Sequence, residues 1–254
     1  MTDLLVRGAA IFGCPRAEDE GGVIGSRLES ELGHRLPKAA AELFAFRGLI
    51  GRIAAVFEGQ TELPRSARLA DSRQMPGRAD PILLLLTENQ GVCYWGVPMS
   101  QGDNPPVLVG GDISRAREMT VEYAPTVGHF VYAFAWDSEL FAGWQSELPD
   151  HSPMIQAQAR TLDSDVLDLL RGRYKEEVET HGWPGSVQRR FRSTAGLRIG
   201  LWNAEDQCDW WISAPTDAIL AEELRWLIGV SNLRESLWSN DVEGEALLRD
   251  IRGR

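Results

Sequence analysis

The chain has 254 residues, of which 43% are hydrophobic and 25% are charged, a composition typical of globular proteins. A chain of this length buries roughly 70–75% of its unfolded surface, which excludes a largely disordered protein and a small scaffold held by disulfides or metal. The formal net charge is −11, which argues against a nucleic-acid-binding protein because such proteins need a basic surface to contact phosphates. An acidic protein attracts basic partners.

The three cysteines, Cys14, Cys93 and Cys208, are widely spaced and form no CxxC pair. The sequence therefore predicts neither a disulfide framework nor a zinc cluster. The residues before Cys14 resemble a lipoprotein cleavage site, but Asp3 and Arg7 interrupt the basic start and the apolar stretch of a signal peptide. No window reaches the roughly 18 apolar residues of a membrane span. We expect a cytoplasmic protein without membrane association.

The chain is predicted to begin with helices. Residues 26–32 carry leucines at helical spacing, and Gly33 is placed to end this helix in a left-handed conformation. Leu36-Pro37 predicts the start of the next helix, because proline is favoured in a first turn. Two glycines predict a break near Gly48. Residues 59–80 contain glycine and proline between polar residues, which is typical of a surface connection.

Residues 81–110 predict an antiparallel meander of three strands. An apolar run of strand length opens the segment, turn residues follow at 89–91, and the later parts are rich in strand formers. Residues 129–136 are also rich in strand formers, so we expect them to extend this sheet. A helix is expected to follow at 138–148.

The second half of the chain predicts a further set of helices and strands. A helix is expected from Asp163 to about His181. The alternating segments 190–202 and 209–212 flank a polar loop and predict a second hairpin. Helices with leucines on one face are expected at 218–228 and 242–251.

This order of elements predicts an α+β fold with a mixed, largely antiparallel sheet flanked by helices. Residues 149–161 contain prolines and small polar residues, and predict a linker. We therefore expect an α+β domain over residues 1–150 and a C-terminal α+β region over 160–254, which either forms a domain or completes the first one. Residues 127–254 carry 21 acidic and 13 basic side chains. This half is the expected docking place for a cationic partner.

Several local patterns resemble functional sites but lack an essential part. Gly21–Ser26 is glycine-rich like a phosphate-binding loop but has no lysine, so a flexible turn is expected. The acidic residues at 163–168 lack the glycine and glutamate of a calcium loop and suit a helix N-terminus. Glu177 and His181 are four residues apart, without the further ligands of a metal site. We predict no catalytic residue, metal or cofactor.

The chain contains nine tryptophans, most of them on predicted strands or apolar helix faces. Large aromatic side chains at such positions are expected in the core. Trp210 and Trp211 are adjacent, so in a strand they point to opposite faces, and one of them is expected to be partly exposed. Trp183 lies in a predicted loop and is a second candidate for exposure. Partly exposed tryptophans beside acidic residues suit a protein interface.

An apolar strand is followed by Glu88–Val97 (ENQGVCYWGV) and then by Asp103–Val107 (DNPPV). This pattern resembles the SUKH superfamily, which is named partly for yeast regulators of cell-wall synthesis and is abundant in bacteria. The helix start at Leu36-Pro37 and the position of Trp136 before a helix are similar to the family as well. The resemblance covers roughly residues 26–148.

The resemblance implies an α+β fold with a largely antiparallel sheet flanked by helices. It also implies a function, because most bacterial members are immunity proteins of polymorphic toxin systems. Such proteins are not enzymes, and each binds and blocks a toxin, commonly a nuclease. The family has no fixed catalytic residues, so none is assigned to this chain, which is longer than a minimal family domain.

We therefore expect a non-enzymatic immunity protein that neutralises a basic, nuclease-type toxin. Its acidic side chains would occupy the phosphate-binding surface of the toxin and speed the encounter. The candidate contacts are Glu205, Asp206 and Asp209 in the second hairpin, with Trp210 or Trp211 as the apolar anchor. The alternatives are an intracellular scaffold or regulatory protein without a toxin partner, and a hydrolase or transferase, which needs a pocket of clustered titratable residues.

Overall fold

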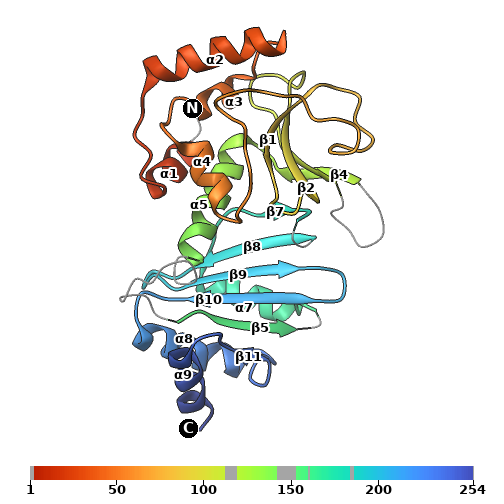
Figure 1. The fold of residues 1–254 in the computed structure, drawn as a ribbon. Helices are drawn as coiled ribbons and strands as arrows, with labels where there is room; N and C mark the ends of the chain where they lie inside the picture. Colours follow the sequence, from red (N-terminus) through yellow and green to blue (C-terminus); the bar gives the residue numbers. More distant parts are fainter. Residues whose placement is uncertain (1–2, 112–118, 142–152, 160, 184–185, 254) are drawn as a thin grey trace. The chain divides into compact units, whose positions relative to one another are not determined.

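The computed structural model describes residues 3–111, 119–141, 153–159, 161–183 and 186–253 (Figure 1). The chain forms two compact units, which are made of Met1–Trp136 with Thr180–Pro184 and of Asp137–Glu179 with Gly185–Arg254. Each unit has its own sheet, helices and hydrophobic core. The predicted α+β class is confirmed, and the strand pairings described within the two units are antiparallel.

The first unit combines a four-stranded sheet with helices. Its helices are α1 (Asp3–Ile11), α2 (Glu18–Leu32), α3 (Lys38–Leu43), α4 (Leu49–Ala55) and α5 (Val127–Leu140), whose last residues belong to the second unit. Its strands are β1 (Ile82–Thr87), β2 (Cys93–Pro98), β3 (Val107–Gly111) and β4 (Met119–Ala124), in the order β1-β2-β3-β4, and the short β7 (Thr180–His181). The meander predicted over 81–110 is confirmed by the pairing of β1 with β2 and of β2 with β3.

Helix α5 replaces the strand that was predicted at residues 129–136. Nearly every residue of α5 within the first unit is buried, and a helix that is apolar all round is a core helix. Phe130 and Phe134 contact Tyr123 of β4, and Phe134 also meets Trp95 of β2 with ring centroids 5.9 Å apart. A continuous apolar segment can form either a fully buried strand or a buried helix, and the strand prediction was wrong for this segment.

The segment from Gln60 to Met75 covers β1 and part of the sheet. Gln60 pairs with Thr87 and Leu69 pairs with Leu83 along the free edge of β1. Met75 is 2% exposed and packs with Ile82 and Leu108. The prediction of a plain surface connection at 59–80 was therefore wrong in part, because this segment closes a strand edge that would otherwise expose unpaired backbone groups.

The helix boundaries of the first unit follow its glycines. Gly33 ends α2 with a φ of 66°, and Gly48 precedes α4 with a φ of 76°, so both predictions are confirmed. The flexible turn predicted at Gly21–Ser26 is wrong, because these residues lie inside α2. Within the described ranges, the chain has no helix of the length and apolarity that a membrane crossing needs.

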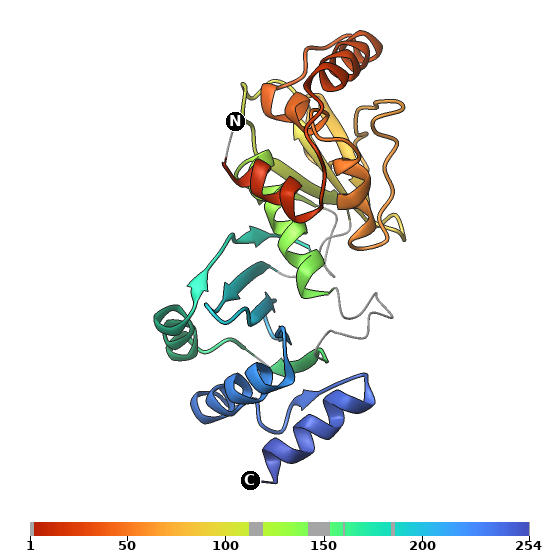
Figure 2. The same cartoon turned by 90° about the vertical axis from the view of Figure 1, so that its left-hand side faces the viewer.

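The second unit contains a sheet with the strand order β11-β5-β10-β9-β8-β6. Its strands are β5 (Ile155–Ala159), β6 (Lys175–Glu176), β8 (Val187–Arg192), β9 (Arg198–Asn203), β10 (Cys208–Ser213) and β11 (Leu237–Trp238). Its helices are α7 (Ser164–Arg173), α8 (Asp217–Val230) and α9 (Val242–Arg252) (Figure 2). The hairpin of β9 and β10 and the helices α8 and α9 confirm the corresponding predictions.

The two faces of this sheet differ. Along β10, Cys208, Trp210 and Ile212 are buried and belong to the core formed with α7, α8 and α9. The residues between them, Asp209 and Trp211, point to the other face and are half-exposed. Along β10, the second face therefore carries the side chains that remain accessible to a partner.

Two predictions for the second half are corrected. Residues 149–161 are not simply a linker, because β5 runs from Ile155 to Ala159 and pairs with β10 and β11. The helix predicted from Asp163 to His181 begins as expected, with the Asp163 carboxylate accepting from the Asp165 N–H, but it ends at Arg173. Residues 142–148 of another predicted helix lie outside the described residues, as do 149–152 and 160.

Candidate functional site

The hairpin of β9 and β10 presents the predicted acidic contacts at its tip. Cys208 pairs with Asn203, and the Ala204 N–H donates to the Gln207 carbonyl at 2.7 Å, which closes the turn. Glu205 and Asp206 lie in this turn and are exposed. Among the residues that the structure describes, neither carboxylate has an ion-pair or hydrogen-bond partner. Both charges therefore face solvent uncompensated.

Asp209, the third predicted acidic contact, is held by neutral amides. The Gln207 Nε2 atom donates to both carboxylate oxygens at 2.9 Å, and the Gln158 Nε2 atom donates to Oδ1 at 3.0 Å. In the sheet, Asp209 lies opposite Gln158 on β5 and Trp202 on β9. The amides fix the carboxylate in position without neutralising its charge.

The two predicted anchor tryptophans have different environments. Trp210 is 2% exposed and lies in the core of the second unit, so it is not available to a partner. Trp211 is half-exposed on the other face, and its ring centroid lies 5.1 Å from that of Trp202 and 5.3 Å from that of Phe141. Of the two predicted anchors, Trp211 remains the candidate.

A further tryptophan, Trp238, was not singled out from the sequence. It lies on the two-residue strand β11 and is 42% exposed. Trp238 and Trp211 both pair with Gln156 of β5, one from each side. A two-residue strand leaves no alternation in the sequence, so no local pattern marks Trp238 as a surface residue. The other candidate for exposure, Trp183, instead packs on Trp95 with ring centroids 5.3 Å apart.

These side chains line a groove of about 400 Å³ on the sheet. Its polar lining consists of Gln156, Gln158 and Asp209, and its aromatic lining includes Trp211 and Trp238. Gln156 is 4% exposed and lies between Trp211 and Trp238 in the sheet. We name these five residues the groove set. The groove set and the two tip carboxylates together form the candidate partner-binding surface.

The arginines of β8 and β9 are engaged by acidic residues of the same unit. The pairs are Arg189 with Glu176 and Glu179, Arg190 with Asp137, Arg192 with Glu177, and Arg198 with Glu139. Hydrogen bonds from Arg171 and Arg189 outweigh burial and hold the pKa of Glu176 below its usual value. The positive charge of β8 and β9 is therefore compensated internally, whereas the carboxylates of the hairpin tip are not.

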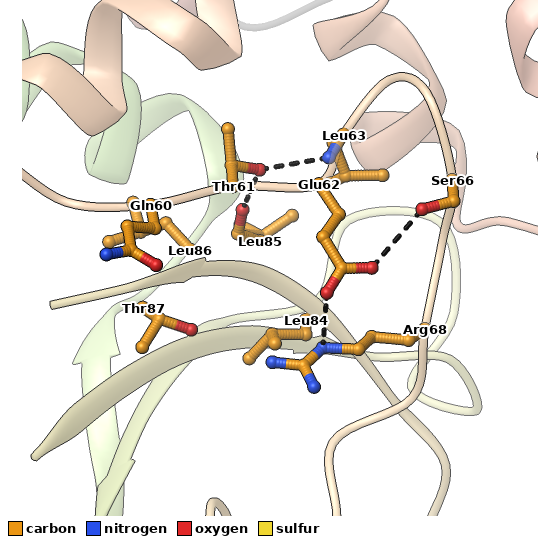
Figure 3. Close-up of a pocket in the computed structure, with 10 residues that line it drawn as sticks. All are labelled: Gln60, Thr61, Glu62, Leu63, Ser66, Arg68, Leu84, Leu85, Leu86 and Thr87. Carbon is orange, nitrogen blue, oxygen red and sulfur yellow. Dashed lines mark hydrogen bonds and ion pairs between the residues drawn. The ribbon is translucent and has the colours of Figure 1, made fainter. Parts of the chain in front are cut away.

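A small cleft of about 140 Å³ lies at the edge of β1 in the first unit (Figure 3). The Thr61 hydroxyl donates to the Leu85 carbonyl at 2.7 Å, and the Ser66 hydroxyl donates to Glu62 at 3.2 Å. Glu62 also pairs with Arg68 at 3.4 Å. These bonds join the covering segment to β1 and to itself, which gives the cleft a structural role.

A wide groove of about 590 Å³ lies on α7 and α8. Leu169 is 46% exposed there, and the Arg173 guanidinium lies 4.6 Å from the ring centroid of Trp226. Arg173 also pairs with Glu223 at 2.9 Å, and the Tyr174 hydroxyl donates to the same carboxylate at 2.7 Å. Burial and this hydrogen bond raise the pKa of Tyr174. Arg173, Tyr174 and Glu223 thus form one hydrogen-bonded cluster at this groove.

The patterns considered for metal binding have structural explanations. Glu177 accepts hydrogen bonds from Lys175 at 3.0 and 3.2 Å, and His181 lies on β7 rather than on a shared helix face. In the described part of the chain, no group of three or more His, Cys, Asp or Glu side chains is arranged to hold a metal ion.

Comparisons with protein-family models, with curated proteins and with solved structures found no match. The function of the surface is therefore argued from its own geometry and charge.

Proposed function

We propose that the chain is a non-enzymatic binding protein that captures a basic protein on the second face of the β5–β10–β9 sheet. We further propose that this partner is a toxin domain, as in the bacterial immunity proteins of the SUKH superfamily, and that the protein acts in the cytoplasm. The observation that carries the proposal is the pair of uncompensated carboxylates, Glu205 and Asp206, on the hairpin that also presents Asp209 and Trp211.

Two properties of this surface support the proposal: its exposed negative charge and its apolar contact area. Exposed charges of one sign accelerate the approach of an oppositely charged protein. Tryptophan contributes more binding energy than most residues because it removes a large apolar area from water. Trp211 and Trp238 supply that area on the same sheet, where Trp211 is two residues from Asp209 on β10. A basic partner with an apolar contact patch matches both features.

The sequence pattern of residues 82–109 supports the choice of partner. It resembles a superfamily whose bacterial members mostly bind and block toxins, commonly nucleases. Nucleases are basic where they bind phosphates, so an acidic surface competes for the same groups. A scaffold or regulatory protein with another basic partner is the alternative function, and identification of the partner separates the two.

The test is affinity capture of the tagged protein from the lysate of its host at low and at high salt. The charge-reversed variant Glu205→Lys/Asp206→Lys is compared with Asp217→Lys/Glu222→Lys, which places the same charge change on α8, the helix that packs on the other sheet face. We expect a basic toxin domain that is captured by the wild type and the control, lost from the hairpin variant, and weakened by salt.

Two outcomes contradict the proposal. Capture of a partner equally by all three proteins removes the hairpin from the interface. Capture of a basic housekeeping protein that depends on the hairpin rejects the toxin partner and establishes the scaffold function. For a captured toxin domain, inhibition of its activity by the purified protein completes the test.

A further inference from the structure

The residues of the groove set are neighbours on three adjacent strands, β11, β5 and β10. On β5, Gln156 lies between Trp238 of β11 and Trp211 of β10, because both tryptophans pair with it in register. Asp209 is two residues before Trp211 on β10, so its side chain projects from the same face. On its other side Trp211 pairs with Gly200 of β9, and its ring packs against those of Trp202 and Phe141. The groove thus has two indoles, two side-chain amides and a carboxylate.

The Gln156 amide is the most informative member of this set. Gln156 is 4% exposed and lines the groove between the two tryptophans. Its carbonyl oxygen accepts hydrogen bonds, and its amide nitrogen donates them. Because most of the side chain is buried, its amide has a restricted position from which it can bond to a ligand in the groove.

We infer that the groove binds an arginine side chain of the partner. A guanidinium group is planar, carries five N–H donors, and stacks on aromatic faces. It therefore matches a carboxylate and an amide oxygen as acceptors beside two indoles. A lysine ammonium is a compact, strongly hydrated charge, and makes less use of the flat aromatic walls. This inference rests on the proposed function, because it names the chemistry of a basic partner at the same surface.

The test uses free probes and the complete chain. Acetyl-arginine amide is titrated into ¹⁵N-labelled protein, and the indole N–H resonances of Trp211 and Trp238 are followed after assignment with Trp211→Phe and Trp238→Phe. Acetyl-citrulline amide has nearly the same shape without charge, and acetyl-lysine amide has the charge without the planar donors. We expect saturable shifts at both indoles with arginine, weaker shifts with lysine, and none with citrulline.

Variants separate the contributions of the groove set. Asp209→Asn keeps the shape of the side chain and removes its charge, Gln156→Leu removes the amide, and Trp238→Ala removes one indole. Each change is expected to weaken arginine binding about tenfold or more, which is the effect of losing one charge-assisted or cation–π contact. Glu222→Gln on α8 removes one charge outside the groove and is expected to bind as the wild type does. Circular dichroism confirms that each variant is folded.

Equal shifts with arginine and citrulline, or an Asp209→Asn variant that binds arginine like the wild type, overturn the inference. Absence of arginine binding to the wild type overturns it as well. The proposed function fails separately: a captured toxin whose binding ignores Trp238→Ala and Asp209→Asn leaves the function standing and rejects the arginine site. If the protein binds arginine but captures no toxin, the arginine site stands and the toxin partner is rejected.

Discussion

A buried ion pair joins the end of α5 to the second sheet. Arg190 Nε and Nη2 donate to the two carboxylate oxygens of Asp137, both at 2.7 Å, and the two residues are each 2% exposed. Removal of one partner leaves an uncompensated buried charge, which costs about 3–5 kcal/mol. We expect Asp137→Ala to lower the free energy of unfolding by that amount in urea titrations.

An exposed pair of the same unit provides the control for this prediction. Arg225 and Asp250 lie 3.7 Å apart with side chains that are 43% and 48% exposed. Surface pairs of this kind contribute about 0–1 kcal/mol, so Asp250→Ala is expected to change the unfolding midpoint little. If Asp137→Ala is as mild as Asp250→Ala, the buried pair does not stabilise the fold.

The buried thiol of Cys208 makes the free energy of unfolding decrease with pH in the alkaline range. Burial, with a smaller effect of Asp209, raises the pKa of Cys208 from 9.0 to about 12. The unfolded chain therefore loses this proton near pH 9 while the folded chain keeps it. The stabilisation is complete below pH 9 and is lost as the pH rises toward 12, by about 1.4 kcal/mol per pH unit.

The measurement is urea unfolding between pH 8 and pH 10.5 in the presence of a reductant. The wild type and Cys208→Ala are compared, since other groups such as Tyr174 titrate in both proteins and cancel in the difference. We expect the wild type to lose stability more steeply above pH 9. Parallel slopes would show that the thiol is not shielded from solvent in the folded protein.

The candidate surface was predictable from the sequence only in part. The adjacency of Trp210 and Trp211 predicted that one lies inside, and the hairpin predicted the position of Glu205 and Asp206 at a tip. Which tryptophan faces the core depends on the helices that pack on the sheet, and these are distant in sequence. Gln156 was missed because it lies in a segment of prolines and small polar residues that resembles a linker.

At the scale of secondary structure, two neighbouring glycines of α2 are expected to respond in opposite ways to substitution by alanine, one gaining and one losing stability. A Cβ atom on Gly21 would lie 2.7 Å from the backbone of Ala45, whereas one on Gly22 would meet no atom within 4 Å. Alanine favours helix over glycine by about 0.5–1 kcal/mol. We expect Gly22→Ala to raise the thermal unfolding midpoint and Gly21→Ala to lower it.

This pair of variants tests whether Gly21 serves close packing of α2 on the segment before α4. Each variant is the control for the other, because both make the same chemical change in the same helix. Two stabilised variants would mean that the approach of Ala45 to Gly21 is relaxed easily. Two destabilised variants would contradict the helix itself and favour a turn at these residues.

The elements that were predicted wrongly share a physical cause. Residues 129–136 combine aromatic and β-branched residues that favour strands. Because the segment is apolar on all sides, it can also form a buried helix. β5 was missed because alternation over Ile155–Ala159 is short and includes alanines. The helix from Asp163 ends at Arg173, directly after Gly172, because Lys175 and Glu176 pair with β8 instead. Tertiary contacts decided each of these cases.

At the scale of the whole molecule, charge is unevenly distributed. The chain has a net charge of −11, and the arginines of β8 and β9 are paired within the second unit. The long-range field that a partner meets therefore comes from unpaired carboxylates such as Glu205 and Asp206. Such fields act mainly on the association rate and are screened by salt, with a Debye length of about 10 Å at 0.1 M.

Stopped-flow association with the captured basic partner tests this view. The wild type is expected to associate faster at low salt and to slow steeply as salt is added, since screening removes the steering. Glu205→Lys/Asp206→Lys is expected to associate at least about tenfold more slowly at low salt and to depend weakly on salt. Its dissociation rate should change less, because exposed rim charges influence the encounter more than the bound state. Asp217→Lys/Glu222→Lys carries the same net charge, so a comparable loss in this control would attribute the steering to total charge rather than to the hairpin tip.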